Sequence, residues 1–506
     1  MPEGLLTHWA LTTIVYASAL FIFVIGTAAL IAVVVYVIDR AQTANAIRRN
    51  FPVVGRLRYL FEHLGVFFRQ YFFAMDREEL PFNRAQRRWV DSASSNESNT
   101  HPFGSTRDMR LPGTVMFANS PFARMSEDAV PAAPLTIGPD CPTPYAAPSF
   151  FNISGMSYGS ISMPAVRALS RGAAAAGIWL DTGEGGLSDW HLEGGGDIVF
   201  QIGTAKYGVR TLDGDLDEKL LRRVAERPTV RMFEIKLSQG AKPGKGGILP
   251  AIKVTEEIAR VRNIPQGRDS VSPNRFPEIA NTAELLDFVA RVRAVTGKPV
   301  GIKTVIGDPE WLDELGAEIN RRGAASAPDF ITVDSADGGT GASPLPLLDY
   351  TGMLIADSLP LTCDKLEAHG LRQRIKVIAS GKLMMPGPVA WALAAGADFV
   401  QSARVFMFAL GCIQAMQCNR NTCPTGVTTH DPRLQRGLVV PDKATRVAAY
   451  ARNVVREVGI IAHSCGLDDP RQLSRHHCWI TGADGRPRRL SELFPPVQPG
   501  QAPAAG

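Results

Sequence analysis

Three cysteines stand close together in the stretch GCIQAMQCNRNTCPTGV, residues 411–427. Cys412, Cys418 and Cys423 are separated by five and four residues. The chain has seven cysteines, and the other four are scattered without the spacing of a disulfide framework, which indicates a reducing compartment. Clustered thiols in such a compartment usually bind metal or carry out redox chemistry. The residues alone leave open an iron–sulfur cluster, a zinc site completed by His430, or three unrelated buried thiols.

Polar and glycine residues that follow apolar runs indicate a bound cofactor. Lys303 stands in the apolar run PVGIKTVIG, where its neighbours are expected to be buried. An ammonium in that position offsets the negative charge that builds on a reduced flavin. Gly381 follows the run KVIAS, and residues 402–404 follow or end the run DFVQS. Because barrels commonly bind phosphate at these two places, the pattern predicts a phosphate-bearing cofactor.

Short apolar runs recur between about Ser149 and Arg404, and each ends in Gly, Asp, Lys or Ser before a helix-like stretch. Eight such units are typical of an α/β fold, the (β/α)8 or TIM barrel, whose site lies at the carboxyl ends of the strands. A doubly wound sheet is the main alternative, but it would need fewer strands and a nucleotide fingerprint, and SGMSYGS is not GxGxxG. The expected strands are FFNISGMSYG, IWLDTGEGG, DIVFQIG, MFEIKLSQG, PVGIKTVIG, FITVDSADGG, KVIASGK and DFVQSAR.

An uncharged apolar run extends from Trp9 to Ile38. It exceeds the ~20 residues that cross a bilayer, and it lacks the short apolar region and cleavage site of a secretory signal. We therefore predict one transmembrane helix within residues 1–40. Several arginines follow the run, so the positive-inside rule predicts a single-pass protein of the inner (plasma) membrane with its catalytic domain in the cytoplasm. These arginines are Arg40, Arg48, Arg49, Arg56 and Arg58.

The rest of the 506 residues is expected to form three further regions. Residues 41–148 are membrane-proximal: aromatics and arginines interleave in residues 51–90, which predicts a helix lying on the membrane or packed on the core. Residues 91–148 are expected to be an irregular connecting layer. Residues 149–450 form the barrel with its cysteine loop, and residues 451–506 form a C-terminal extension whose tail, PPVQPGQAPAAG, is expected to be disordered. The net charge of +5 is mild and spread out, so we expect no nucleic-acid partner.

Five motifs in order, ISGMSYGSIS, TGEGG, EIKLSQGAKPGKGG, SADGGTGASPL and NTCPTGV, resemble the FMN-binding synthase domain of glutamate synthase. The resemblance covers about residues 149–450. It implies a (β/α)8 barrel, bound FMN, a [3Fe-4S] cluster held by the three cysteines, and reduction of the 2-iminoglutarate that forms from 2-oxoglutarate and ammonia. A ferredoxin-like protein or another electron carrier is the expected donor.

The resemblance also assigns roles to residues of the TGEGG and EIKLSQGAKPGKGG motifs. Lys236 and Lys242 match lysines near the flavin and the oxo acid, and Gln239 lies between them. Arg262 matches a residue that binds the second substrate carboxylate, and Glu184 matches a glutamate on the ammonia path. The expected FMN-binding residues are Ser154, Gly155, Met156, Ser157, Gly183, Gly185, Lys236, Gln239, Lys303, Ser335, Asp337, Gly338, Gly339, Gly341, Gly381, Ser402, Ala403 and Arg404.

The sequence also departs from the family pattern. Ile248 stands where the family has a glutamine, and Lys245 stands where it has a glutamate, so the identity of the oxo or amino acid is left open. The chain opens with MPEG rather than with a glutaminase nucleophile, so ammonia is expected from solution, from a separate glutaminase subunit or from an amino acid substrate. The aromatic-rich flank favours self-association into a homo-oligomer.

Two other functions are compatible with these residues. One is an FMN-dependent amino acid or 2-hydroxy/2-oxo acid oxidoreductase that is coupled to a membrane electron carrier. The other is a non-catalytic, membrane-tethered scaffold or redox sensor, in which the cluster would be kept for structure.

Overall fold

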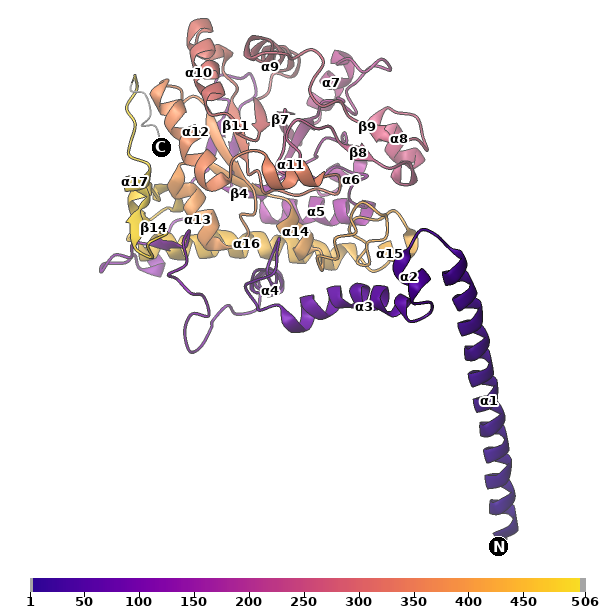
Figure 1. Cartoon of the computed structure of the whole chain (residues 1–506). Coiled ribbons are helices and arrows are strands. Elements are labelled where there is room, and N and C mark those ends of the chain that lie inside the picture. The colour runs from indigo at the N-terminus through magenta and orange to yellow at the C-terminus, as the bar shows by residue number, and fades with distance from the viewer. Residues whose placement is uncertain (1–2, 501–506) are drawn as a thin grey trace. The chain divides into compact units, whose positions relative to one another are not determined.

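The chain folds into two units, residues 1–85 and residues 86–506, which are described separately (Figure 1). The structure is a computed structural model that describes residues 3–500, with side chains from residue 8 onward. The last part of the tail that is predicted to be disordered, residues 501–506, lies outside the described residues.

The first unit is helical throughout most of its length. Helix α1 (Glu3–Ala41) is followed by α2 (Ala46–Asn50), α3 (Gly55–Phe68) and the π-helix η1 (Arg69–Phe73). Within α1, residues His8–Ala41 have a mean hydropathy of 2.9 and none of the apolar window is buried. By length and composition this is the one helix of the described chain that could cross a membrane.

An ion pair between a buried carboxylate and an exposed arginine joins the end of α1 to the start of α3. Asp39 is 1% exposed, and the guanidinium of Arg56 lies 2.8 Å from its carboxylate. The backbone N–H of Val53 donates to the same carboxylate at 3.1 Å. Because an unpaired buried carboxylate is costly, this contact fixes the turn between the two helices.

The second unit contains a closed barrel of parallel strands, so the predicted (β/α)8 barrel is confirmed (Figure 1). Each of the predicted apolar runs holds one strand, and the last strand, β13, pairs with the first, β4. The strands are β4 (Phe151–Ile153), β5 (Leu180–Asp181), β6 (Ile198–Ile202), β7 (Val230–Lys236), β10 (Val300–Thr304), β11 (Phe330–Asp334), β12 (Lys376–Ser380) and β13 (Phe399–Ser402).

Helices alternate with these strands, and their ends follow local sequence signals. In α5, the Ser162 hydroxyl accepts a hydrogen bond from Ala165 N–H at the start, and Gly177 ends the helix with φ of 67°. The helices are α5 (Met163–Ala176), α6 (Asp189–Leu192), α7 (Glu218–Ala225), α8 (Glu256–Arg262), α9 (Thr282–Thr296), α10 (Glu310–Arg322), α11 (Leu345–Tyr350), α12 (Ile355–Ala368), α13 (Pro386–Ala395) and α14 (Arg404–Ala409).

A short hairpin covers the amino-terminal end of the barrel. Strands β2 (Leu135–Ile137) and β3 (Tyr145–Ala147) pair antiparallel, and Ile137 and Tyr145 join the buried cluster that fills the barrel with Trp179 and Phe399. This hairpin lies in the region expected to be irregular, where β1 (Val115–Phe117) and the turn η2 (Ser126–Asp128) also form. Helix α4 (Arg84–Ser94) lies mostly within residues 51–90, where a helix was expected. The hairpin leaves the carboxyl ends of the strands as the available face for a site.

Helix α16 (Val440–Ser464) packs along α5, and Figure 1 shows it crossing beneath the barrel. The approach is close because Gly172 has no side chain: a Cβ there would lie 2.5 Å from Val447 Cγ1. The domain boundary predicted at residue 450 falls inside this helix. The remaining elements are β8 (Ile248–Leu249), η3 (Ala251–Lys253), β9 (Ser270–Val271), η4 (Ala324–Ser326), α15 (Pro432–Gln435), η5 (Pro470–Gln472), η6 (Arg475–His477), β14 (Cys478–Thr481), β15 (Pro487–Arg489) and α17 (Leu490–Leu493).

Candidate active site

A carboxylate bridges two lysines at the carboxyl ends of the strands. Glu184, three residues beyond the end of β5 at Asp181, lies 3.2 Å from Lys236 Nζ and 3.4 Å from Lys242 Nζ. Lys236 ends β7, and Lys242 stands in the loop that follows it. The two lysine side chains are 9% and 4% exposed and that of Glu184 is 19% exposed. We call these three residues the lysine–glutamate cluster.

The charges of this cluster depend on one another. Burial would raise the pKa of Glu184, but Lys236 and Lys242 lower it to about 2, so this carboxylate is ionised at neutral pH. Burial lowers the pKa of Lys236, and Lys242 adds to this effect, whereas Glu184 opposes it. Gln239, which the sequence placed between the lysines, accepts a hydrogen bond from Lys236 Nζ through its Oε1.

Arg262 brings a further cation to the cluster. Its side chain is buried at 4% exposure, Glu184 contributes to its electrostatic environment, and its guanidinium stacks over the Tyr207 ring at 5.0 Å. Its Nη2 donates to Tyr158 O at 3.1 Å, but its Nε is buried and has no hydrogen-bond partner among the described residues. A buried guanidinium N–H without a partner is costly, so this atom is a donor that an anionic ligand could satisfy.

A polar layer lies inside the barrel. Lys303, 5% exposed, donates to Ser154 Oγ at 3.1 Å. Glu234 accepts from Gln201 Nε2 at 2.5 Å, and that amide also lies 3.3 Å from Asp181. Burial alone would lower the pKa of Lys303, but neighbouring carboxylates, Asp334 and Glu234 among them, raise it, so its ammonium keeps its charge. Burial raises the pKa of Asp181 well above its usual value.

The loops after β7, β11 and β12 approach one another closely because glycines stand at the points of contact. A Cβ on Gly240 would lie 1.9 Å from Ser335 O, and a Cβ on Gly381, whose φ is +131°, would lie 2.4 Å from Ser335 Cβ. Gly339 lies against Arg404, since a Cβ there would be 2.5 Å from Nη1. Burial lowers the pKa of Arg404, whereas the nearby carboxylate of Asp337 raises it.

The cysteine loop adjoins one of these turns. A Cβ on Gly341 would lie 3.5 Å from Cys418 Cβ, so the SADGGTG turn and the cysteine loop are in contact. Cys412, Cys418 and Cys423 are all free thiols. Burial raises the pKa of Cys412 to about 12, whereas hydrogen bonds from neighbouring threonines lower the pKa of Cys423 against the effect of its burial.

Two observations bear on what the cysteines could bind. Among the described residues, no three Cys, His, Asp or Glu side chains are close enough to share one metal ion. His430, considered above as the fourth ligand of a zinc site, has its Nε2 at 2.8 Å from Gly159 O and therefore donates a hydrogen bond there. That nitrogen is not available to a metal, which disfavours the zinc interpretation.

Sequence analysis missed several neighbours of the site. Gly203 and Gly247 both pack on the lysine–glutamate cluster: a Cβ on Gly203 would lie 2.7 Å from Glu184 Cβ, and one on Gly247 would lie 3.2 Å from Lys242 Nζ. Asp181 and Glu234 of the polar layer were also missed. Both acids stand in predicted strands at positions that a barrel interior normally fills with apolar residues, and this was the available signal.

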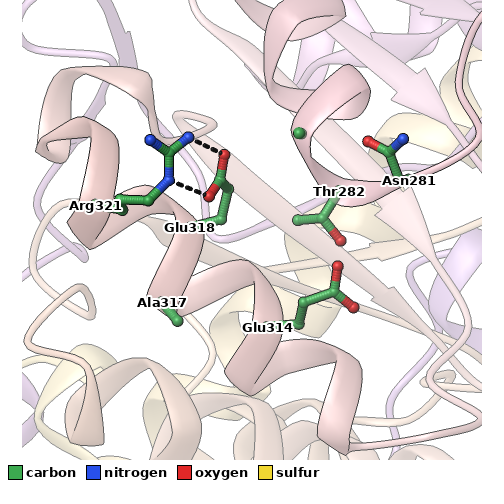
Figure 2. A pocket seen from close by; sticks show the side chains of 7 residues that line it. Asn281, Thr282, Glu314, Ala317, Glu318 and Arg321 are labelled. Carbon is green, nitrogen blue, oxygen red and sulfur yellow. Dashed lines mark hydrogen bonds and ion pairs between the residues drawn. The ribbon is translucent and has the colours of Figure 1, made fainter.

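A surface recess lies on the outer helices, as Figure 2 shows. Glu318 and Arg321 form an ion pair on one side of it, and none of the predicted site residues contributes to its lining. Its lining residues are Asn281, Thr282, Ala283, Glu314, Ala317, Glu318 and Arg321.

The family model described as the conserved region in glutamate synthase matches residues 138–468. The chain belongs to the glutamate synthase family. A glutamate synthase large subunit-like protein of Bacillus subtilis (strain 168), YerD, is 39% identical over 518 residues, which cover 94% of this chain and 98% of that protein. The chain is thus an oxidoreductase of the glutamate synthase type, acting on CH–NH2 donors.

Archaeal-type members of the glutamate synthase family match a smaller share of the chain. The archaeal-type glutamate synthase (NADPH) of Thermotoga neapolitana is 33% identical over 317 residues, which cover 62% of this chain and 59% of that protein. Among solved structures, flavocytochrome b2 with sulfite bound has a TM-score of 0.47 at 14% identity, covering 88% of this chain and 93% of that chain.

Membership of the glutamate synthase family implies FMN and an iron–sulfur cluster, and the residues present fit both groups. Arg404 is a half-buried cation that lies against Gly339 in a glycine-rich turn, an arrangement that suits a phosphate. The charged Lys303 suits the ring of a reduced flavin. The free thiols of the cysteine loop suit iron.

Proposed function

We propose that this chain reductively aminates 2-oxoglutarate to L-glutamate, through 2-iminoglutarate, with FMN and a [3Fe-4S] cluster. The observation that carries the proposal is the charge around Glu184. Glu184 is the carboxylate that forms ion pairs with the buried Lys236 and Lys242, and the buried Arg262 also lowers its pKa. Arg262 retains an Nε–H without a hydrogen-bond partner among the described residues. A dicarboxylate ligand would supply the missing negative charge.

Each residue of the cluster has a task that suits its chemistry. FMN, when bound, supplies the hydride. Arg262 Nε donates to a substrate carboxylate, and Lys242 holds the second carboxylate or gives a proton as the imine carbon is reduced. Glu184 holds both lysines in place and keeps their charges, and it is placed to accept an N–H of incoming ammonia. The reaction consumes the oxo acid, ammonia, two electrons and protons, and it releases water.

The substrate is tested by reoxidation of the reduced flavin under anaerobic conditions. 2-Oxoglutarate with ammonium is expected to restore the flavin absorbance and to yield glutamate, whereas either compound alone is not. Lys245 and Ile248 depart from the family pattern, but both are exposed. The buried charges of Glu184, Lys236 and Lys242 are therefore the same as the family pattern implies. Reoxidation by another 2-oxo acid but not by 2-oxoglutarate would contradict the proposed substrate.

Replacing Cys412, Cys418 and Cys423 together with serine is expected to remove the iron and leave FMN bound. Serine hydroxyls do not replace thiolates as iron–sulfur ligands at neutral pH. Iron and flavin content after anaerobic purification measure the result, with about three irons per FMN expected in the unchanged protein. A matched control replaces Cys465 and Cys478, which are buried away from the loop, and is expected to keep its iron. Iron that survives the triple replacement would contradict the ligand assignment.

The proposed electron donor is a ferredoxin-like carrier, because a cluster beside a flavin accepts electrons one at a time. The archaeal-type relatives have NADPH in their names. Reduction of the flavin by a reduced ferredoxin is therefore compared with reduction by NADPH alone. Rapid reduction of the flavin by NADPH without a carrier would contradict the ferredoxin-like donor.

The proposed location is the inner membrane, with α1 as the span and the barrel in the cytoplasm. Aromatic side chains of η1 are largely exposed, with Phe72 at 75% and Phe73 at 73%, so this segment is proposed to lie in the lipid interface. Tryptophan introduced at Phe23 in α1 is expected to be quenched by lipids brominated deep in their acyl chains. Tryptophan at Phe72 is expected to be quenched by lipids brominated near the headgroup.

The matched control for these two variants is tryptophan at Phe122, which lies in the second unit and is 88% exposed. Its added fluorescence is expected to be insensitive to brominated lipid, and fluorescence of the unchanged protein is subtracted in each case. An unquenched Phe23→Trp would contradict the span, and an unquenched Phe72→Trp would contradict the interfacial location alone.

A further inference from the structure

Lys253 is a buried cation between the substrate loop and the cysteine loop, and none of the roles above uses it. It ends the turn η3, which follows the GKGGILP stretch. Its side chain is one of the fully buried ones of the chain, with 2% exposed. Because an ammonium loses its hydration when it is buried, its surroundings must offset a large cost.

The ammonium of Lys253 donates to backbone carbonyls in separate segments. Thr428 O lies at 2.7 Å, Cys418 O at 2.9 Å and Ser160 O at 3.4 Å. An ammonium has three N–H donors, so these carbonyls use all of them. Ser160 belongs to the loop after β4, which carries predicted FMN-binding residues, while Cys418 and Thr428 belong to the cysteine loop and its return. Lys253 therefore joins the two sides of the site.

The negative charges that Lys253 meets come from the cysteines. Burial lowers the pKa of Lys253 to about 8, and the groups that oppose this effect are Cys418 and Cys423. Burial lowers the pKa of the nearby His430 ring, and the charge of Lys253 adds to this effect. The hydrogen bond from Lys253 to Cys418 O places its ammonium beside the loop that carries the candidate iron ligands.

We propose that Lys253 is a positioning residue for the iron–sulfur cluster, which it serves by tying the cysteine loop to the loop after β4 and by supplying a fixed positive charge beside the sulfurs. This inference rests on the cluster proposed above. Reduction adds negative charge to a cluster, so a nearby cation stabilises the reduced form and raises the reduction potential.

The chain offers a matched control for this lysine. Lys298, 8% exposed, also donates to three backbone carbonyls, those of Ala225, Arg227 and Val230. It precedes β10 at the amino-terminal end of the barrel, where burial lowers its pKa and the charge that acts on it is that of Arg231, with no cysteine involved. Replacing either lysine removes the same hydrogen bonds from the fold, but only one replacement removes charge from the cysteine loop.

The experiment compares Lys253→Met, Lys253→Arg and Lys298→Met, each as the full chain with its cofactors. Iron loss to a chelator and the midpoint potential of the cluster, followed by EPR during a redox titration, are the two measurements. Lys253→Met is expected to lose iron about 10–100-fold faster and to show a more negative potential. Lys253→Arg is expected to keep a potential near that of the unchanged protein, and Lys298→Met to match it in both measurements.

The outcomes separate this inference from the function on which it rests. An unchanged protein without iron overturns the proposed cluster itself. Iron in the unchanged protein, with the same potential in Lys253→Met, overturns the role of Lys253. If Lys253→Met does not fold, Lys253→Arg decides: a potential shifted away from the unchanged protein, despite the retained charge, overturns the electrostatic part of the inference.

Discussion

Replacing Lys242 with alanine is expected to lower the turnover of 2-oxoglutarate and ammonium by about 10²–10⁴-fold while FMN stays bound. The physical reason is that Lys242 is the buried cation, 4% exposed, that Glu184 holds at 3.4 Å on the substrate side of the site. Its loss removes a partner for the substrate and a proton donor together. Lys303 and Arg404, which are proposed to hold the flavin, are unchanged in this variant, so the absorbance of bound FMN is the internal check.

The same loop supplies the control for Lys242→Ala. Lys245 is exposed and lies three residues farther along the chain, so Lys245→Ala changes the net charge equally without reaching the buried cluster. Its turnover is expected to stay within about twofold of the unchanged protein, as for a surface substitution. Equal losses in the two variants, or full turnover in Lys242→Ala, would contradict a catalytic role for Lys242.

Glu184→Gln is expected to destabilise the fold by roughly 3–5 kcal/mol, as measured by guanidinium unfolding in mild detergent. Glutamine keeps the shape but removes the charge that neutralises Lys236 and Lys242 at 3.2 and 3.4 Å. Two buried ammoniums would then face a neutral amide and each other. Glu218→Gln is the matched control, because Glu218 and its partner Arg291 are 43% and 47% exposed and such pairs contribute roughly 0–1 kcal/mol.

The pH dependence of unfolding adds a second signature for Glu184. Its pKa is about 2 in the folded chain against an ordinary value of 4.5, because Lys236 and Lys242 overcome the effect of burial. A depressed pKa stabilises the fold above the unfolded value, and this stabilisation is lost as pH falls from 4.5 toward 2. The unchanged protein is therefore expected to lose more stability than Glu184→Gln over this range. Parallel pH profiles would contradict the ionised state of Glu184.

The barrel could be predicted because its signal is local. Each apolar run, such as KVIAS before Gly381 or DFVQS before Ala403, has the length of one strand and ends in residues that suit a loop. Parallel strands in a barrel bring their carboxyl ends to one face, so residues at those ends were expected to meet before any distance was known. Lys303, buried among the apolar neighbours of its strand, follows the same reasoning.

Elements without a periodic pattern were not predicted. The hairpin of β2 and β3 consists of two strands of three residues each, which are too short to show alternation. Only its packing against Trp179 and Phe399 in the barrel makes it stable. Two-stranded hairpins are marginal by themselves, so the structure forms where the barrel provides a partner.

The sequence by itself determined the order of the strands, the residue types at their ends and the presence of three thiols in one loop. The tertiary structure alone decided which of these residues touch. Glu184 meets Lys242 across 58 residues, and Lys253 meets Cys418 across 165. Contacts at such separations leave no local pattern, because they depend on how the barrel closes rather than on neighbouring residues. Closure of β13 onto β4 is thus what turns separate cations and thiols into one site.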